Sequence, residues 1–408
     1  MTRIVIVGAS VGGVKTAQGL RSGGFDGEIV VVEKEDVAHP YDKPPLSKAY
    51  LTSPDDLGAI RLIDQEDLAA IDASWRFGVA ATGLDPAAKE LLLEDGERLA
   101  YDALVIATGS RARTSPWGEG PGIHVLRTAA DAHALRSALQ PGRRLVIVGG
   151  GFIGAEVAAT ARKAGVDVTI VDPLPAPMSR VLNEDVGRIF LDKHAAEGVR
   201  TRFGTGVDGV ERVGPELEVR LSDGERITAD ALLVGIGAVV NTEWLEGSGL
   251  VVDNGIVTDG RLRAIGAADV FVVGDVCRWQ HEDGSGSTRL EHWTSAADQA
   301  RLVAHNLLSP AEARAYVPVE YVWSDQYDWK IQVVGRTGSA ESQLIGDPAH
   351  DRFAVVYSDG ARVTGAVIVN WPRALIAARR AVADRGDADA LVTMLTEIIA
   401  KAPAPVVS

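Results

Sequence analysis

Short apolar runs that end in glycine or an acid set the pattern of the first half of the chain. Residues 4–7 are uniformly apolar, as in a strand buried on both faces of a parallel sheet. Gly8–Gly13 follow as a G-x-S-x-x-G turn, and helical periodicity continues over residues 14–20. A second apolar run, residues 29–32, ends at Glu33. The pattern therefore predicts a strand, a glycine turn, a helix and a second strand with an acid at its end.

This order of elements is typical of a dinucleotide-binding unit. A glycine turn lets a pyrophosphate lie against backbone N–H groups at a helix N-terminus, and an acid at the end of the second strand can accept ribose hydroxyls. A lone glycine motif is weak evidence, but here all four context elements accompany it.

The chain then repeats the unit. An apolar run at 145–148 precedes Gly149–Gly154, which keeps all three glycines. A helix is predicted over 155–164 and a strand over 168–171, which leads to Asp172. Two copies indicate two bound nucleotides. The alternative is that one or both copies are vestigial and bind nothing.

Composition narrows the class of protein. A length of 408 residues suggests about three domains. The 46% hydrophobic and 24% charged residues are typical of a globular protein, and no apolar run reaches the roughly 20 residues that span a bilayer. The first strand follows Met1 almost at once and leaves no room for a signal peptide, so we expect a cytoplasmic protein without membrane contact. The net charge of -15 argues against nucleic-acid binding.

Cysteine and histidine usage excludes two kinds of chemistry. Cys277 is the single cysteine, so the chain cannot form the dithiol pair of a disulfide reductase. It follows an apolar run, and we expect an inert buried thiol; a reactive thiol is the alternative. The eight histidines lack metal-ligand spacing, so we expect no metal site.

The segment after the first unit contains an unusually placed lysine. Pro44 and Pro45 suit the entry to a helix, because proline is favoured at the first helical position. Lys48 then falls in the first turn of that helix, where a cation is disfavoured. A nearby bound anion or carboxylate would explain it, and a solvated surface lysine is the alternative.

The pattern of predicted helices and strands changes after residue 316. Before it, the run 270–275 predicts a buried strand that ends at Asp275, either a ligand-binding carboxylate or a helix N-cap, and a helix is predicted over 294–308. After it, the pattern predicts a separate α+β domain. Its strand candidates are 321–327, 330–334, 353–357 and 366–369, and its helices are 372–383 and 391–399.

With the two glycine units, the Gly-Asp strand end and the W-S-D-Q segment at 323–326, the chain resembles the FAD-dependent ferredoxin reductases of the putidaredoxin reductase type. The resemblance implies an α/β fold of two Rossmann-like, glutathione-reductase-like domains and a C-terminal α+β interface domain. It implies an FAD domain at 1–112 and 241–316, an NAD domain at 113–240 and an interface domain at 317–408.

The resemblance also implies site residues. Lys48 is expected beside the flavin ring and paired with Glu156, and Trp323 is expected between the flavin and a docked ferredoxin; a core tryptophan is the alternative. These three residues are the implied catalytic set. Ala81 and Arg127 are expected at the adenosine end of FAD, Asp275 at its ribityl chain and Trp293 beside its ring. The implied FAD residues are Gly8, Ser10, Gly12, Gly13, Glu33, Lys43, Lys48, Ala81, Gly109, Arg127, Asp275 and Trp293. The implied NAD residues are Gly149, Gly151, Phe152, Ile153, Gly154, Glu156, Asp172, Arg180 and Gly237.

Three positions depart from the pattern of the family. Lys43 stands where many relatives have arginine, and Phe152 stands where many have tyrosine, which would remove a hydroxyl contact. Ser10 replaces the middle glycine of the first turn, and its Cβ is expected to push the pyrophosphate slightly away.

The implied function is transfer of electrons from NADH through FAD to a two-iron ferredoxin, which serves a cytochrome monooxygenase or a ring-hydroxylating dioxygenase. Asp172 would repel a 2′-phosphate, and no arginine follows it before Arg180, so we expect NADH over NADPH. Arg373, Arg379 and Arg380 form a candidate docking patch for the ferredoxin or an ordinary solvated face. A monomer or weak homodimer is expected.

Two other functions remain open. The same fold could serve an NADH oxidase, a monodehydroascorbate reductase or a rubredoxin reductase. A flavoprotein that binds a partner according to its redox state is the alternative from another class.

Overall fold

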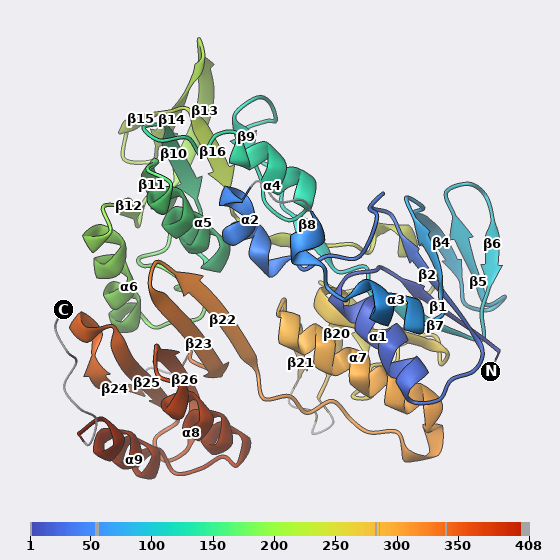
Figure 1. The fold of residues 1–408 in the computed structure, drawn as a ribbon. Coiled ribbons are helices and arrows are strands. Elements are labelled where there is room, and N and C mark those ends of the chain that lie inside the picture. Colours follow the sequence, from blue (N-terminus) through green and yellow to red (C-terminus); the bar gives the residue numbers. More distant parts are fainter. Residues whose placement is uncertain (1, 54–56, 282–283, 285, 339–340, 401–408) are drawn as a thin grey trace. The chain divides into compact units, whose positions relative to one another are not determined.

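The computed structural model describes residues 2–53, 57–281, 284, 286–338 and 341–400, which form two compact units (Figure 1). The first unit comprises Met1–Asp42, Asp55–Arg111 and Ala238–Pro318. The second comprises Lys43–Pro54, Ala112–Gly237 and Val319–Ser408.

A parallel five-stranded sheet forms the centre of the first unit. Its order is β19 (Val270–Val272), β7 (Ala103–Ile106), β1 (Arg3–Val7), β2 (Glu28–Glu33) and β3 (Ser74–Phe77). The central strands are buried on both faces, which explains their uninterrupted apolar sequences. Two helices pack against each other beside this sheet, α1 (Val11–Ser22) and α7 (Trp293–Leu308).

The first unit also contains smaller sheets and short helices. One antiparallel sheet contains β4 (Ala81–Asp85), β5 (Glu90–Leu93) and β6 (Arg98–Ala100). A mixed sheet contains β18 (Ile256–Thr258), β20 (Cys277–Gln280) and β21 (Ser287–Thr288), in which β18 and β20 are parallel and β20 and β21 are antiparallel. Strand β8 (Ser110–Ala112) pairs with β17 (Ala238–Val240). The short helices are η2 (Leu57–Ile60), α3 (Gln65–Ala70), η3 (Glu243–Leu245), η4 (Gly274–Val276) and η5 (Pro310–Glu312).

The second unit repeats the parallel sheet. Its order is β12 (Arg200–Phe203), β11 (Asp167–Asp172), β10 (Arg144–Val148), β16 (Ala231–Val234) and β9 (Ile123–His124). The helices of this part are α4 (Ala129–Arg136), α5 (Phe152–Lys163) and α6 (Glu184–Ala196). An antiparallel excursion follows, with β13 (Val207–Val213), β14 (Glu216–Leu221) and β15 (Arg226–Ala229). The short helices η1 (Pro44–Ser47) and α2 (Ala49–Thr52) pack against α5, which is why this N-terminal segment groups with the second unit.

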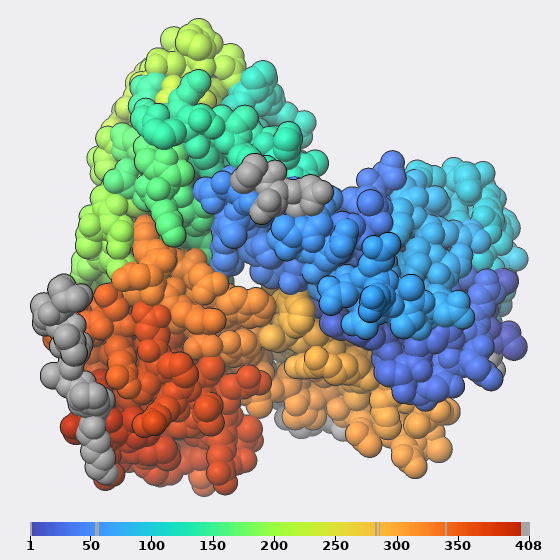
Figure 2. All heavy atoms as spheres, viewed as in Figure 1, coloured from blue at the N-terminus to red at the C-terminus, as the bar shows by residue number. Residues whose placement is uncertain are grey.

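An antiparallel sheet forms the C-terminal part of the second unit. Its order is β22 (Tyr321–Gln326), β23 (Trp329–Gly335), β26 (Val363–Val369), β25 (Arg352–Ser358) and β24 (Glu341–Asp347), with η6 (Pro348–His350) before β25. The helices α8 (Pro372–Ala383) and α9 (Ala388–Ala400) cover one face, and their red atoms lie at the surface in Figure 2. The other face packs against Met178, Leu182, Val186 and Phe190 of the nucleotide-binding part.

The fold class expected from the sequence is confirmed, because two Rossmann-like parallel sheets and a C-terminal α+β part are present. Strand β24 was missed. It is an edge strand on which Ile345 is the buried residue, so its sequence lacks a hydrophobic alternation. The domain boundaries stay a prediction.

Two predictions from composition concern the state of Cys277 and membrane-spanning helices. Cys277 is fully buried, and burial raises the pKa of its thiol to about 12, so the prediction of an inert thiol is confirmed. None of the helices within the described ranges is long and apolar enough to cross a membrane.

A buried histidine lies where α6 meets the C-terminal sheet. His194 is 1% exposed, its Nδ1 lies 2.6 Å from the Tyr327 hydroxyl, and its Nε2 has no hydrogen-bond partner within the described part of the chain. Burial lowers the pKa of His194 to about 4. The histidine is therefore neutral in the folded protein, while in the unfolded chain it titrates near pH 6.5.

We expect this histidine to make folding sensitive to acid. The folded pKa lies below the unfolded value, so the contribution is complete above about pH 6.5 and is lost as the pH falls toward 4. Between pH 7 and pH 5 the loss is about 2 kcal/mol. His194→Asn, which cannot titrate, should lack this part of the loss in urea unfolding. Equal losses for both proteins would contradict the assignment.

Candidate functional site

The two glycine turns have the same backbone geometry. Ser10 caps α1 with φ -87° and ψ -166°, and Gly151 caps α5 with φ -75° and ψ -174°. In both turns the helix approaches the preceding strand closely. A Cβ on Gly13 would lie 1.8 Å from the Gly8 carbonyl oxygen, and one on Gly154 would lie 2.0 Å from that of Gly149. Only glycine fits these two positions, as the close packing of a nucleotide-binding turn requires.

Each turn is tied to the acid at the end of its second strand. Glu33 accepts hydrogen bonds from the backbone N–H of Ala9 at 2.7 Å and of Glu35 at 2.9 Å. Asp172 accepts them in the same way from Gly150 at 2.7 Å and Leu174 at 2.8 Å. A carboxylate has about four lone-pair sites, so each acid still has acceptor capacity for ribose hydroxyls. The structure thus holds both acids beside the turns.

The residues fit two dinucleotides, with one difference between the turns. A Cβ on Gly151 would meet nothing within 4 Å, so the space in front of this turn is open for a pyrophosphate. In the first turn the Ser10 side chain stands at the equivalent position and makes no capping hydrogen bond to α1. Ser10 therefore projects toward the place that the equivalent glycine leaves open.

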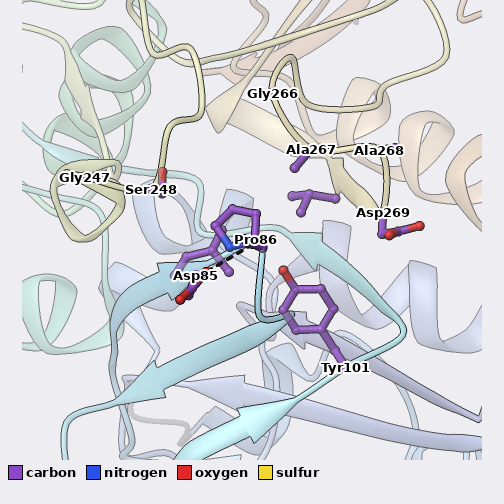
Figure 3. Close-up of a pocket in the computed structure, with 12 residues that line it drawn as sticks. Asp85, Pro86, Tyr101, Gly247, Ser248, Gly266, Ala267, Ala268 and Asp269 are labelled. Carbon is purple, nitrogen blue, oxygen red and sulfur yellow. Dashed lines mark hydrogen bonds between the residues drawn. The ribbon is translucent and has the colours of Figure 1, made fainter.

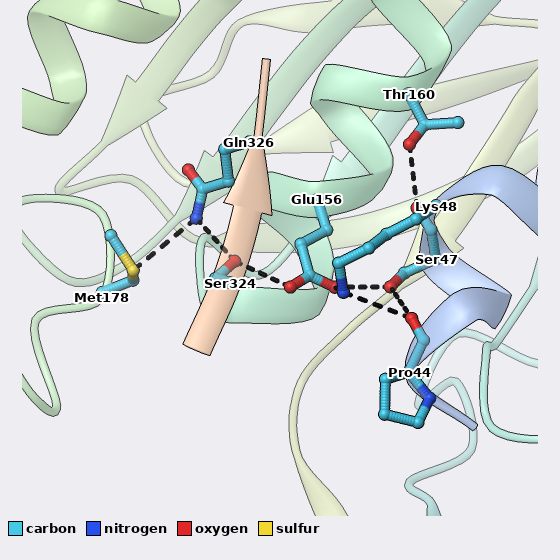
Figure 4. Close-up of polar contacts among 8 residues, drawn as sticks. All are labelled: Pro44, Ser47, Lys48, Glu156, Thr160, Met178, Ser324 and Gln326. Carbon is cyan, nitrogen blue, oxygen red and sulfur yellow. Dashed lines mark hydrogen bonds and ion pairs between the residues drawn. The ribbon is translucent and has the colours of Figure 1, made fainter. Parts of the chain in front are cut away.

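A buried ion pair joins α5 to residues 44–48, which we call the proline segment. The Nζ of Lys48 lies 2.8 Å from Oε2 of Glu156, and the two side chains are 20% and 3% exposed (Figure 4). Lys48 does not lie inside a helix as predicted. It lies between the two short helices, because η1 ends at Ser47, one turn after it begins at the prolines, and α2 begins at Ala49. The carboxylate explanation for the lysine is confirmed, since Glu156 is its partner.

Hydroxyl groups complete the surroundings of Glu156. The Ser47 hydroxyl donates to Oε2, and the Ser324 hydroxyl of β22 donates to Oε1 at 2.7 Å. The Ser47 carbonyl in turn accepts a hydrogen bond from Thr160 of α5 at 2.9 Å. Sequence reasoning did not select these hydroxyls. The signal that could have found Ser324 is a polar residue at an inward position of a predicted strand.

Several expected flavin residues lie in the first unit. Trp293 begins α7, and its indole N–H donates to Asp42 at 2.7 Å. Burial raises the pKa of Asp42, against the Trp293 hydrogen bond, which lowers it. Asp275 lies inside η4, so it is not a helix N-cap, and its carboxylate accepts a hydrogen bond from the Ser110 hydroxyl at 2.7 Å. Ala81 begins β4, and Gly109 follows β7 with φ +62°.

The remaining expected flavin residues come from both units. Lys43 caps η1 and Arg127 precedes α4, so both belong to the second unit together with Lys48. Gly12 lies in α1, where a Cβ would be 3.0 Å from Val273. The expected flavin set is thus divided between the two units.

The expected NAD residues gather at the carboxyl end of the second parallel sheet. Phe152 and Ile153 begin α5; Phe152 packs into the core against the C-terminal sheet, and Ile153 is 45% exposed. Arg180 lies beside Gly237, where a Cβ would be 3.8 Å from its Nη1 atom. Ligands bind at this edge of parallel sheets.

Trp323 is part of an aromatic stack at the surface of the C-terminal part. Its ring lies 6.3 Å from that of Tyr321 at an angle of 23°, and the Arg379 guanidinium of α8 lies 5.0 Å from the centre of the Tyr321 ring. Both aromatic side chains are partly exposed. Tyr321 was not expected from the sequence; its place two residues before Trp323, on the same face of the strand, was the available signal.

A cavity of about 650 Å³ lies at the opposite edge of the first sheet (Figure 3). It is lined by Asp85, by Asp269, which precedes β19, and by Tyr101, which precedes β7. Asp269 is paired with Lys89 at 2.6 Å, and Asp85 accepts hydrogen bonds from the backbone of its own turn. The cavity lies at the amino ends of these strands, at the opposite edge of the sheet from the first glycine turn, whereas ligands of parallel sheets bind at the carboxyl ends.

Comparison with known proteins places this geometry in a family. The family described as pyridine nucleotide-disulphide oxidoreductase matches residues 2–300, and the family described as reductase C-terminal matches residues 321–395.

Relatives and solved structures resemble nearly the whole chain. A rhodocoxin reductase from Rhodococcus erythropolis is 38% identical, over 93% of this chain and 89% of the relative. The ferredoxin–NAD(+) reductase component of an anthranilate 1,2-dioxygenase system from Burkholderia cepacia is 37% identical, over 93% of each chain. The crystal structure of a covalent putidaredoxin reductase–putidaredoxin complex superposes with a TM-score of 0.91 at 34% identity, over 99% of each chain.

The resemblance seen in the motifs is thereby confirmed. FAD and NADH are the cofactor and the electron donor of these reductases. The chain belongs to the pyridine nucleotide-disulphide oxidoreductase family and, within it, to the flavoprotein ferredoxin–NAD(+) reductases.

Proposed function

We propose that this protein passes electrons from NADH, through FAD, to a two-iron ferredoxin that serves an oxygenase. The observation that carries the proposal is a pair of nucleotide-binding turns in a chain whose single cysteine is buried. A second thiol would be needed for disulfide chemistry, so the acceptor is not a disulfide. Relatives named as reductase components of dioxygenase systems, and one named rhodocoxin reductase, support a ferredoxin as the acceptor.

FAD is held by the first glycine turn and by Glu33, together with the other flavin residues named above. Bound there, FAD supplies the chemistry that connects a two-electron donor with a one-electron acceptor. Within the chain, Glu156 holds the Lys48 ammonium in a fixed position. A fixed cation stabilises negative charge that develops next to it, without the cost of reorganising solvent.

NADH is held by the second glycine turn. The open space at Gly151 admits its pyrophosphate, and Asp172 accepts hydrogen bonds from its ribose. Arg180 and Gly237 border the same edge of the sheet.

The docking surface for the ferredoxin is the exposed face of α8. Arg373, Ile376, Arg379 and Arg380 are all exposed there, and Ile376 is 71% exposed. An apolar centre with a basic rim suits an acidic partner with an apolar patch, and in a chain of net charge -15 such a patch overcomes the long-range repulsion. Arg379 connects this face to Tyr321 and Trp323. We place the reaction in the cytoplasm, where NADH is available, and assign the protein as a monomer or weak homodimer.

Steady-state reduction of two-iron ferredoxins encoded near this protein, with NADH as donor, tests the proposed function. Purified protein should be yellow and should reduce one of them faster than it reduces oxygen. Protein that remains colourless after reconstitution with FAD would overturn the proposal.

The glycine at the open position should matter for binding and not for folding. Gly151→Ala leaves the backbone unstrained, because its φ of -75° suits any residue, but places a methyl group where the pyrophosphate would lie. We expect at least about a tenfold loss of NAD+ affinity with an unchanged melting temperature. Gly154→Ala is the contrasting variant, because its Cβ has no room and should destabilise the fold. Unchanged NAD+ affinity in Gly151→Ala would contradict the placement.

The choice of nucleotide should follow the acid at the second strand. Asp172 should repel the 2′-phosphate of NADPH, so kcat/KM for NADH should exceed that for NADPH by about tenfold or more. Asp172→Asn removes the charge and keeps most of the shape, and it should narrow the ratio. Comparable wild-type turnover with both nucleotides would show that Asp172 does not select the donor.

Charge on α8 should affect ferredoxin reduction alone. Reversal of Arg373, Arg379 and Arg380 to glutamate should lower kcat/KM for the ferredoxin about tenfold or more at low salt, and leave ferricyanide reduction unchanged. Reversal of Arg98, Arg188 and Arg226, whose side chains are 60–61% exposed, provides a control with the same change of net charge outside α8. Equal losses with both acceptors would refute the docking surface.

A further inference from the structure

The strand β22 presents different chemistry on its two faces. Side chains alternate along a strand, so Tyr321 and Trp323 share one face, while Ser324 and Gln326 share the other. The aromatic face carries the stack with Arg379. On the opposite face, Ser324 is fully buried and Gln326 is 2% exposed.

The buried face of β22 leads directly to Glu156. The Gln326 side-chain amide donates to the Ser324 hydroxyl at 3.2 Å, and that hydroxyl donates to Oε1 of Glu156 at 2.7 Å (Figure 4). The same amide lies 3.8 Å from the Met178 sulfur. The Ser324 hydroxyl has one hydrogen, which it donates to Glu156, so its oxygen accepts the hydrogen bond from the Gln326 amide. The chain of hydrogen bonds therefore runs from Gln326 through Ser324 to Glu156.

The two oxygens of Glu156 depend on different segments. Oε2 receives Lys48 and Ser47, which belong to the proline segment. For Oε1, the hydrogen bond found within the described ranges comes from Ser324. A buried carboxylate needs donors on both oxygens, because an unsatisfied one carries its full desolvation cost. Ser324 therefore determines how the carboxylate plane is turned while Oε2 faces the ammonium.

We propose that Ser324, supported by Gln326, is a positioning residue for the nicotinamide site: it holds Glu156 in the orientation that places the Lys48 ammonium. The inference rests on the proposed function, because it assigns Glu156 and Lys48 to the site where NADH reacts. It extends that function by making a strand of the C-terminal part contribute to the reductive half of the reaction. The motif residues that follow Trp323 thus acquire a role that is separate from electron exit.

The expected consequence is a loss of catalytic alignment. Without the Ser324 hydroxyl, Oε1 either stays unsatisfied or turns toward another donor, and Lys48 moves with the carboxylate. Small displacements of groups around a reacting centre are sufficient to slow a reaction by one to two orders of magnitude. The effect should fall on the rate of reduction by NADH more than on the fold.

The test compares Ser324→Ala with Thr337→Val in the FAD-loaded protein. Thr337 is also a buried residue of the C-terminal part and is 3% exposed. Its hydroxyl donates to the Val181 carbonyl at 2.5 Å and not to Glu156. Each variant removes a buried hydroxyl and the hydrogen bond that it donates. Ser324→Ala also removes the acceptor of the Gln326 amide, and the melting temperature measures that structural cost. The measurements are the NADH reduction rate by stopped flow, NAD+ binding by calorimetry and the melting temperature.

We expect Ser324→Ala to slow the rate of flavin reduction by NADH about tenfold and to change the NAD+ dissociation constant. Thr337→Val should change neither quantity. Ser324→Thr keeps the hydroxyl and should recover most of the rate. Gln326→Met, which removes the amide that supports Ser324, provides a second variant that does not touch Glu156, and it should give a smaller loss in the same direction.

The outcomes separate the two proposals. Wild-type protein that binds FAD but is not reduced by NADH would overturn the proposed function. Wild-type protein that is reduced, with Ser324→Ala and Gln326→Met both matching Thr337→Val in rate and in NAD+ affinity, would overturn the positioning role and leave the function intact. A loss in Ser324→Ala that Ser324→Thr recovers would support the role.

Discussion

The burial of one carboxylate is the constraint on which the second unit depends. Glu156 lies on the inner side of α5 with a side chain 3% exposed, and a buried charge without partners costs several kcal/mol. Its three partner residues come from two separate segments: Lys48 and Ser47 from the proline segment, and Ser324 from β22. The requirement to satisfy this group explains why the proline segment packs against α5. The same contact holds the Lys48 ammonium in a fixed position.

The strand β22 carries side chains of different chemistry on its two faces. Its aromatic face carries Trp323 and Tyr321 beside the basic helix α8, and its polar face carries Ser324 toward Glu156. A strand has only two faces, so a residue pair one position apart necessarily points in opposite directions. The aromatic pair and the buried hydroxyl therefore share one backbone segment, and a displacement of that segment moves both.

Duplication gives the protein two similar cradles with one instructive difference. Gly8 and Gly149 turn the backbone in the same way, with φ of +108° and +111°, and each following helix approaches its strand too closely for any side chain. The middle position of the turn is not subject to that contact. Gly151 leaves open space there, while Ser10 fills the equivalent position in the first turn. Backbone packing thus restricts the first and last positions of each turn to glycine, while no packing contact restricts Gly151.

The amino-acid sequence by itself determined the local units: the duplicated strand, glycine turn, helix and acid, the lack of a second thiol, and the α+β character of the last 90 or so residues. These features depend on neighbours in the chain, and for that reason periodicity and turn chemistry predict them. For Lys48 the sequence left an anionic partner and a solvated surface position as alternatives, and the family resemblance named Glu156. Only the tertiary structure decided that Ser47 and Ser324 complete this pair, that Tyr321 lies between Trp323 and Arg379, and that β24 closes the C-terminal sheet. Ser324 and Glu156 are 168 residues apart, and no local pattern encodes a hydrogen bond across that distance.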